Sequence, residues 1–314
     1  MSLPISAVVP ALADLALLEA NLPSLLRELD GVGGELVLVD DTGTGILAGW
    51  AKETFAGLSA DRLRVVSRSD NGGFGRALLD GARIARGELL LAMNPDVRVR
   101  EGFLAPLIHA IEDPEVFAVS PRVLLNGDEA QPESHNALRL EDGRLRAVPR
   151  EPGSSTDPGP IPFTIGGAFL VRRAEFLSGG GFDPLFAPFY WEDVDLCLCA
   201  WRKGRRVEEV PSSVVEHHHR GTIGSAVPED LVLAAIEKNR HLLLWKHLDE
   251  GEAARDHLTS LWRDALDASM AGRREGLVWL ALALQELPYA TDSRAALGAQ
   301  PIGLQAALRM SEPG

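Results

Sequence analysis

The sequence predicts an α/β fold with a mostly parallel central sheet, flanked by helices and followed by a C-terminal helical appendage. Short β-rich runs alternate with longer helical segments through the first half of the chain, the order typical of a parallel sheet with helices on both faces. The run Glu35–Asp40 is almost continuously apolar, as strands buried on both faces are. From near Pro228 the chain becomes rich in Ala and Leu and keeps helical spacing.

Each element of the predicted sheet corresponds to one of these runs. A leucine-rich stretch with mostly helical spacing, Leu12–Leu29, follows the first run, and a second helix is expected over about Gly75–Ala85. After a polar stretch, order resumes with a strand over Phe163–Arg172. The other expected strands are Ile5–Val9, Glu35–Asp40, Leu63–Ser67, Leu89–Met93 and Val116–Ser120.

Two regions are expected along the chain. The first, residues 1–227, holds the sheet, and the second, residues 228–314, is helical and begins with Glu229 and Asp230, where negative charge suits a helix dipole. Between about 125 and 162 the sequence is polar and rich in Gly and Pro. That stretch is either a mobile surface excursion or a flexible flap beside a site.

The composition is that of an ordinary globular protein and argues against some classes. The chain has 45 acidic and 31 basic residues and a net charge of −14, which argues against a nucleic-acid partner because phosphate backbones require a surplus of Lys and Arg. No stretch reaches the roughly 18 apolar residues of a spanning helix. The first 26 residues lack a basic signal region, and the two cysteines fit a reducing compartment. We therefore expect a cytoplasmic protein without a transmembrane segment.

Polar side chains stand just beyond several expected strand ends. They are Asp40, Asp41, Asn71, Asn94 and Asp96. Ligands of parallel α/β sheets bind beyond the carboxyl ends of the strands. These residues are therefore the first indication of a binding site.

Asn94-Pro-Asp96 directly follows the strand Leu89–Met93. A carboxylate held at a strand end can bind a hard divalent cation that also contacts diphosphate oxygens. Asn-Pro and Asp are also common turn residues, and taken alone the motif favours a turn.

A second motif, Trp191-Glu-Asp-Val-Asp195, heads an expected helix. Three carboxylates in four residues repel one another and raise a proton affinity, which turns a carboxylate into a general base. The alternative is acidic capping of the helix. The preceding run of aromatic residues and prolines, from Phe182, favours a shaped pocket.

Two further motifs carry weaker signals. In His217-His-His219, strand alternation puts His217 and His219 on one side, and one imidazole could assist Asp96 at a metal. Asn71-Gly-Gly-Phe-Gly-Arg76 opens a helix, where backbone N–H groups and the dipole favour an anion. Arg76 is a candidate to face phosphate, with surface charge as the alternative.

Short blocks occur in a fixed order between roughly Ile5 and His247. They are Val8–Pro10, Leu38–Asp41, Asn71–Gly75, Asn94–Val97, Gly166–Leu170, Gly181–Asp183 and Trp191–Leu196, followed by a histidine-containing segment before Gly221. The ordered set resembles family 2 glycosyltransferases of the GT-A type, in particular their rhamnosyltransferase-like branch. The resemblance implies a GT-A nucleotide-binding fold and transfer of a sugar from a nucleotide-diphosphate donor, with inversion at the anomeric carbon.

The resemblance also implies roles for individual residues. Asp193 matches the general base, with Glu192 and Asp195 as its supports. Asp96 matches the ligand of Mg²⁺ or Mn²⁺, and one of His217–His219, with His217 preferred, matches a second metal or diphosphate contact. The remaining implied contacts are Pro10, Asp40, Asp41, Asn71, Arg76 and Asn94 to the donor and Gly166, Gly167 and Trp191 to the acceptor.

Two alternatives from other classes remain open. A sugar nucleotidyltransferase would share the layout, but it should carry a Gly-rich, Arg-containing loop after the first strand, where this chain has Ala11–Asp14. A non-catalytic nucleotide-sugar-binding protein would use its carboxylates only for caps and turns, and the joint presence of Asp96, Glu192 and Asp193 argues against it.

The implied partners are a nucleotide-diphosphate sugar and a glycan or lipid-linked acceptor. The branch resemblance suggests dTDP-rhamnose, with UDP- and GDP-sugars open. A lipid-linked acceptor would bring the protein to the inner face of a membrane as a peripheral protein, and the C-terminal helices could also form a homodimer.

Overall fold

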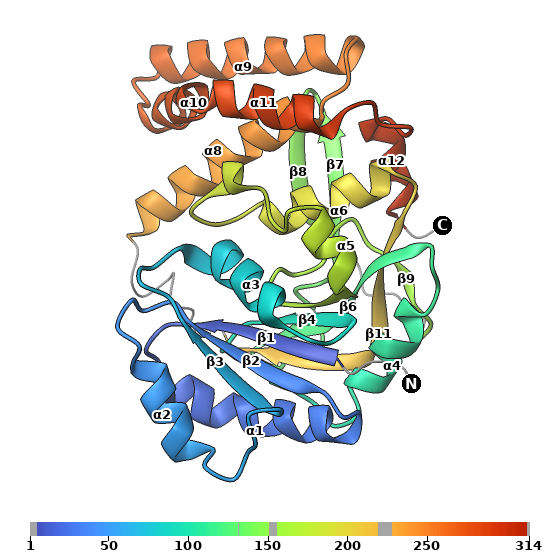
Figure 1. Ribbon diagram of the computed structural model, residues 1–314. Helices are drawn as coiled ribbons and strands as arrows, with labels where there is room; N and C mark the ends of the chain where they lie inside the picture. The colour runs from blue at the N-terminus through green and yellow to red at the C-terminus, as the bar shows by residue number, and fades with distance from the viewer. Residues whose placement is uncertain (1–4, 131, 151–155, 219–227, 313–314) are drawn as a thin grey trace.

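The computed structural model describes residues 5–130, 132–150, 156–218 and 228–312, and its central feature is one large mixed sheet (Figure 1). The strand order is β3-β2-β1-β4-β10-β6-β11-β5, and β9 pairs with β11. Its strands are β1 (Ile5–Ala11), β2 (Glu35–Asp40), β3 (Leu63–Ser67), β4 (Leu89–Met93), β5 (Val97–Val99), β6 (Val116–Leu125), β9 (Gly159–Pro160), β10 (Ala168–Arg172) and β11 (Arg206–His217).

Most strands of this sheet run in one direction, namely β1, β2, β3, β4, β6 and β11. β3, β2, β1 and β4 are parallel neighbours, as is the pair β6 and β11. β10 runs antiparallel between β4 and β6, and the short β5 runs antiparallel to β11. The predicted α/β fold with its mostly parallel sheet is confirmed, and the bounds expected for β2, β3 and β4 match the structure.

Helices cover both faces of the sheet, and further helices form the C-terminal region. They are α1 (Leu15–Gly31), α2 (Ile46–Thr54), α3 (Gly73–Ile84), α4 (Leu104–Ile111), α5 (Arg173–Ser178), the 3₁₀ turn η1 (Pro184–Phe186), α6 (Glu192–Arg202), α8 (Glu229–His247), α9 (Glu252–Met270), α10 (Glu275–Gln285), α11 (Leu287–Leu297) and α12 (Leu304–Met310). No helix in the described ranges has the length and apolar character needed to span a membrane.

The alternation of side chains along each strand explains the two cores on the sheet. In β1, Ala7 and Val9 face a cluster with α1, α2 and α4, whereas Val8 faces a second cluster with α3, α5 and α6. Gly81 on α3 permits the close approach on that second face, because a Cβ there would lie 2.3 Å from a Val8 methyl group.

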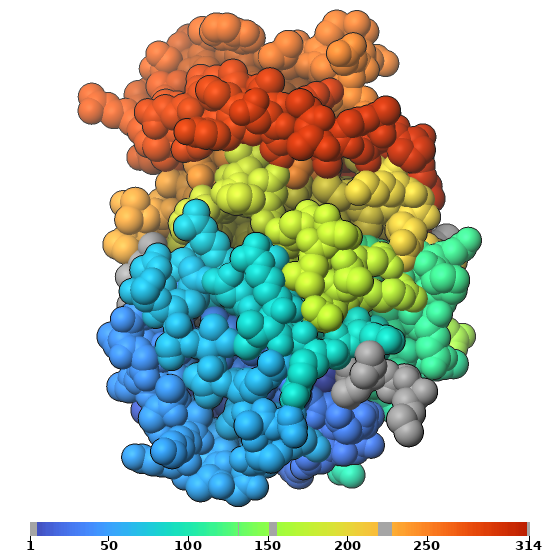
Figure 2. Space-filling model, viewed as in Figure 1, coloured from blue at the N-terminus to red at the C-terminus, as the bar shows by residue number. Residues whose placement is uncertain are grey.

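A third cluster joins the C-terminal helices to the rest of the chain. Helix α6 contributes to two cores: Cys197 and Trp201 pack toward the sheet, and Val194 and Leu198 pack toward leucines of α8. Figure 2 shows the C-terminal helices as one block, orange to red, above the yellow-green segment that leads into α6. The division expected at residue 228 stays a prediction, and this shared core links its two sides.

Two sequence expectations require correction. The region from 125 to 162 is not only an excursion, because it contains an antiparallel hairpin of β7 (Asn136–Glu141) and β8 (Arg144–Pro149). The turn residues Asp142 and Gly143 both have positive φ, 49° and 72°, as a tight two-residue hairpin turn requires. The strand expected over Phe163–Arg172 begins only at Ala168, since the segment before it forms a glycine-containing turn.

Candidate active site

The site lies where parallel strands end and where β11 meets β5. His217 at the end of β11 pairs in register with Val97, and the backbone N–H of His218 donates to the Asp96 carbonyl over 3.0 Å. This short antiparallel pairing brings Asp96, which follows β4, beside His217, although more than a hundred residues separate them in the sequence. His219 lies outside the described residues.

Asp96, His217 and Glu133 form a buried polar cluster. The Nε2 of His217 lies 3.3 Å from Oδ1 of Asp96, and its Nδ1 lies 2.7 Å from Oε2 of Glu133. Burial lowers the pKa of His217, but the two carboxylates outweigh burial and raise the pKa to about 10. An imidazolium therefore supplies the positive charge between the acids, and a cation ligated by His217 would replace the proton on Nε2.

This donor set fits a divalent cation. Oδ1 of Asp96 is buried without a hydrogen bond from the described residues, and carboxylate with imidazole is a ligand pair suited to Mn²⁺ or Mg²⁺. A carboxylate on the far nitrogen of a metal-bound histidine fixes its tautomer and its ring orientation, and Glu133 has this place on His217.

Glu133 was not among the residues predicted from the sequence. It belongs to the polar stretch after β6, and its N–H donates to the Val123 carbonyl over 2.8 Å, which turns the stretch back toward the end of β11. No motif marks it, because its contact with His217 joins positions 84 residues apart.

Glu192 and Asp193 form an acid pair at the start of α6. Two non-glycine residues with positive φ precede them, Tyr190 at 72° and Trp191 at 76°. Strained backbone of this kind is retained at functional sites. The side chain of Asn239 on α8 holds the loop before α6 in place. Its Nδ2 lies 2.7 to 2.9 Å from the carbonyls of Phe186, Phe189 and Tyr190.

The pKa values of both acids are raised. Burial, and then the neighbouring charge of Asp193, raise the pKa of Glu192 to about 8. Burial raises the pKa of Asp193 to about 6, although the N–H groups of Val194 and Gly166 donate to its oxygens over 2.8 and 2.9 Å. One Glu192 oxygen, Oε2, has no hydrogen-bond partner among the described residues. The pair therefore holds one proton near neutral pH.

Asp195 is not brought to this pair. It lies on the opposite side of the helix turn, where its oxygens bind Nζ of Lys246 at 2.8 Å and Nε2 of His247 at 2.7 Å. Asp195, Cys199 and His247 are close enough to share a metal, but the Lys246 ammonium already supplies positive charge there. In the structure Asp195 joins α6 to α8, and its expected role as a support of the base stays a prediction.

The two glycines expected at the acceptor contact side chains of the site. The N–H of Gly166 supports Asp193, and a Cβ at Gly166 would lie 3.2 Å from that carboxylate. A Cβ at Gly167 would lie 2.2 Å from Nδ2 of Asn94, so glycine is required for Asn94 to occupy its place. Trp191, the third expected acceptor residue, caps α6 and packs partly against the third core.

Asp40 and Asp41 are buried and shape the loops at the strand ends. Asp40 accepts from the N–H groups of Thr42 and Leu47, over 3.1 and 2.9 Å, and so fixes the entry to α2. Asp41 accepts from the N–H groups of Gly72 and Gly73, each over 2.9 Å. These contacts hold the start of α3, which the exposed Asn71 precedes, beside β2.

The remaining donor candidates lie apart from each other. Pro10 is buried in β1 opposite Val39 of β2, at the edge where the strands end. Arg76 projects from the first turns of α3 into a cavity that also reaches Glu192. Two adjacent glycines link Asn94 to the acid pair, because Gly166 binds Asp193 and Gly167 packs against Asn94.

Comparison with solved structures places this architecture among the GT-A glycosyltransferases. The structure of GalNAc-T7 with UDP, GalNAc and Mn²⁺ aligns with a TM-score of 0.63 and 21% identity, over 79% of this chain and 48% of that one. Residues 1–349 of S. aureus TarS align with a TM-score of 0.58 and 14% identity, over 98% of this chain and 90% of that one. At these identities the likeness establishes the fold.

The sequence identifies the family. The family described as "Glycosyl transferase family 2" matches residues 6–177, more than half of the chain. The chain belongs to glycosyl transferase family 2, which confirms the predicted family; the rhamnosyltransferase-like branch stays a prediction.

The curated relatives are longer proteins. Polypeptide N-acetylgalactosaminyltransferase 3 of Drosophila melanogaster is 26% identical over 208 residues, which cover 62% of this chain and 31% of the relative. Polypeptide N-acetylgalactosaminyltransferase 10 of Homo sapiens is 26% identical over 210 residues, 64% of this chain and 35% of the relative. The chain thus spans about a third of the length of these relatives.

Proposed function

We propose that this protein transfers a sugar from a nucleotide-diphosphate donor to a hydroxyl group of a glycan or lipid-linked acceptor, with inversion and with a divalent cation. The observation that carries the proposal is the pair Glu192 and Asp193, whose raised pKa values suit proton transfer near neutral pH. The Asp96–His217 cluster, suited to a cation and a diphosphate, supports the donor assignment.

The two groups divide the chemistry between them. Asp193 takes the proton of the acceptor hydroxyl as its oxygen attacks the anomeric carbon, and the neutral carboxyl of Glu192 keeps a second negative charge away from it. Asp96 and His217 would hold the divalent cation, which would supply positive charge against the diphosphate leaving group. Asp41 and the first turn of α3 position the nucleotide side of the donor.

Several nucleotides are candidates for the nucleotide part of the donor. The neighbouring structures contain UDP with GalNAc and Mn²⁺, GDP-Man with Mn²⁺, and UDP-GlcNAc, and the branch resemblance suggests dTDP-rhamnose. A homodimer and peripheral contact with a membrane stay predictions for this chain.

The first test is thermal stabilisation by a panel of UDP, GDP and dTDP, each with and without Mn²⁺. Ligand binding to the folded state stabilises by RT ln(1 + [L]/Kd), about 2.7 kcal/mol at a hundredfold excess over Kd. We expect one nucleotide to stabilise the protein only with Mn²⁺, and Asp96→Ala to abolish that shift. If none stabilises it at millimolar concentration, the donor assignment is wrong. Release of pyrophosphate from a sugar phosphate and NTP would instead identify a nucleotidyltransferase.

Glu133→Gln is expected to weaken Mn²⁺ binding about 10- to 100-fold, because the carboxylate that orients His217 is lost. Calorimetric titration of Mn²⁺ in the presence of the nucleotide measures this. Glu129→Gln is the matched control, since Glu129 lies in the same segment, is exposed and pairs with Arg100. Equal Mn²⁺ affinity in the wild type and Glu133→Gln would show that Glu133 does not position the ligand.

A further inference from the structure

Helix α9 is the outermost helix of the C-terminal block, and its large apolar side chains face outward (Figure 1). Four of them have exposed fractions between 57 and 87%, and we call them the α9 stripe: Leu258, Trp262, Leu266 and Met270. The buried positions of the same helix are small or polar, namely His257, Ser260 and Ala268. A surface helix of a monomeric protein has the opposite arrangement, with its large apolar side chains in the core.

The α9 stripe runs along one side of the helix. Its members are four residues apart, so each step advances by about 40° around the helix axis, and the stripe is about 18 Å long. A row of side chains at this spacing is the ridge that packs into a groove of a second helix. Because a contiguous exposed apolar row marks an interaction surface, the stripe indicates a partner.

Polar contacts on the inner face of α9 fix its orientation. The Nδ1 of His257 lies 2.7 Å from the Gly143 carbonyl in the hairpin turn, and Nε1 of Trp245 on α8 donates to its Nε2 over 3.0 Å. Arg144 of the hairpin forms an ion pair with Asp264 of α9. A rotation that buried the stripe against its own chain would break all of these contacts. The stripe therefore stays available to another molecule.

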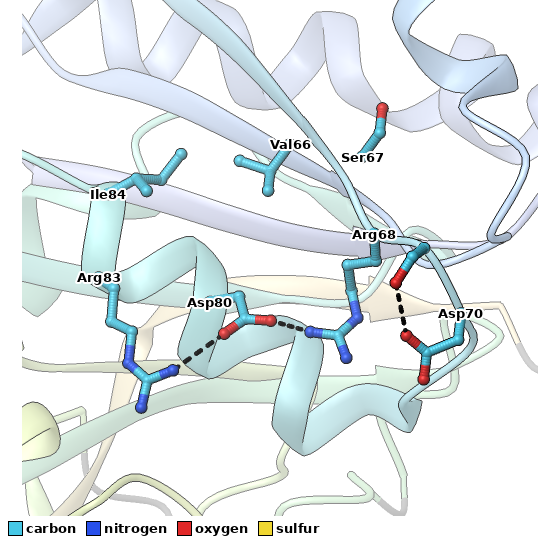
Figure 3. Close-up of a pocket in the computed structure, with 8 residues that line it drawn as sticks. Val66, Ser67, Arg68, Asp70, Asp80, Arg83 and Ile84 are labelled. Carbon is cyan, nitrogen blue, oxygen red and sulfur yellow. Dashed lines mark hydrogen bonds and ion pairs between the residues drawn. The ribbon is translucent and has the colours of Figure 1, made fainter.

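The hollow between β3 and α3 has a different character. Figure 3 shows Asp80 between Arg68 and Arg83, and it forms an ion pair with each of them. These charges are balanced within the chain, whereas the side chains of the α9 stripe face solvent. The stripe is therefore the surface that a partner would stabilise most.

A second copy of this chain fits the stripe better than a membrane does. Residues 252–297, from α9 to the end of α11, contain seven acids, five arginines and no lysine. A helix that binds a bilayer surface has a polar face rich in Lys and Arg, which this region does not have. The net charge of −14 for the whole chain also opposes approach to an anionic surface.

The two ends of α9 carry opposite charges. Residues 252–256 hold two acids and one arginine, whereas residues 271–275 hold two arginines and one acid, and all six side chains are exposed. Antiparallel packing of two copies of α9 puts the acidic end of each beside the basic end of the other. Parallel packing would put like charges together. The charges therefore favour an antiparallel pair.

We infer that two copies of this chain form a two-fold dimer in which their α9 stripes pack antiparallel. A two-fold axis near residue 264 places Leu258 against Met270 of the other copy, and Trp262 against Leu266 of the other copy. Because both copies use the same surface, the interface closes with two chains. Since α9 lies at the end of the molecule away from the sheet (Figure 1), the strand ends of both copies stay open to ligands. The inference is independent of the proposed glycosyl transfer.

The test is sedimentation velocity of the full chain over a range of concentrations. We expect the mass of two chains at micromolar concentration and dissociation on dilution. Trp262→Glu and Leu258→Glu should each weaken the dimer at least about 30-fold, the effect of losing an interface hot spot, because a charge would face apolar side chains. Leu231→Glu is the matched control, since Leu231 of α8 is a helical leucine with an exposed fraction of 56% outside the stripe. It should dimerise as the wild type does, and circular dichroism checks that each variant is folded.

A charge swap tests the antiparallel arrangement. Arg273→Glu with Arg274→Glu should weaken the dimer, and the further addition of Glu252→Arg and Asp256→Arg should restore it. A wild type that stays monomeric at its highest soluble concentration, dimerisation of Leu258→Glu equal to the wild type, or a swap that restores nothing would overturn the inference. Flotation of a monomeric wild type with vesicles of phosphatidylcholine and phosphatidylglycerol, abolished by Trp262→Glu, would overturn it too and assign the stripe to a membrane.

Discussion

Replacing Asp193 with Asn is expected to lower kcat by about 10²- to 10⁴-fold, the contribution of a positioned proton transfer. The amide is nearly isosteric, although the N–H groups of Gly166 and Val194 donate to different oxygens of Asp193 and only one of them keeps an acceptor. Binding of nucleotide and Mn²⁺ should therefore be unchanged. The measurement is initial rate under saturating donor, together with nucleotide affinity from calorimetry.

The pH profile adds a second readout for Asp193. Its carboxylate must be ionised to accept a proton, so the rate should rise tenfold per pH unit below about pH 6 and level off above it. Because Glu192 is coupled to it, the profile reports the pair. A larger loss in Glu192→Gln than in Asp193→Asn would reverse the two roles. A product that retains the donor configuration, seen by NMR, would contradict single-step inversion.

The same shift has a consequence for stability. The pKa of Asp193 rises from 3.8 to about 6 on folding, so between these values the folded state holds a proton that the unfolded state has lost. Stability from this group is present below pH 4 and is lost as the pH rises to 6. Asp193→Asn should therefore be more stable than the wild type at pH 7, at the expense of activity.

Lys246→Met is expected to lower the free energy of unfolding by about 3–5 kcal/mol, the cost of leaving a buried carboxylate without its cation. Lys246 is buried, and its ammonium binds both Asp195 and Asp183 at 2.8 and 2.7 Å. Those carboxylates raise the pKa of Lys246 to about 12 despite the opposing effect of burial. Urea unfolding at pH 7 measures the loss.

The exposed Lys203 offers a matched control for this substitution, and Lys203→Met should change the free energy of unfolding by less than about 0.5 kcal/mol. The double variant Lys246→Met with Asp195→Asn should recover part of the loss, since the buried charge is removed with its partner. A loss below about 1 kcal/mol in Lys246→Met would contradict the view that this pair anchors α6.

The sequence predicts the sheet well because buried parallel strands are apolar along their whole length. The run Glu35–Asp40 needs no knowledge of its neighbours to be identified. The hairpin of β7 and β8 is half polar, so its alternation is weak, yet the pair Asp142-Gly143 was a readable turn signal. β9, with two residues, leaves no pattern at all.

The site could be predicted only where its residues follow a strand or begin a helix. Asp96 and the pair Glu192 and Asp193 have such positions, and their roles in a site stay predictions. Glu133 and Lys246 act through contacts across 84 and 51 residues, which no local pattern encodes. Asp195 was misleading in the opposite way. It is close to the acid pair in the sequence, but the helix directs its side chain toward α8.

The contact of Asp195 with α8 also bears on the order in which a ribosome delivers the parts of this protein. The strands and the segment matched by the family are complete by residue 217, whereas Lys246, His247 and Asn239 leave the tunnel later. Until they emerge, Asp195 lacks the ammonium of Lys246, and the loop before α6 lacks its hydrogen bonds from Asn239. The sheet can therefore fold during synthesis before the start of α6 is held in place, because the residues that hold it come from α8.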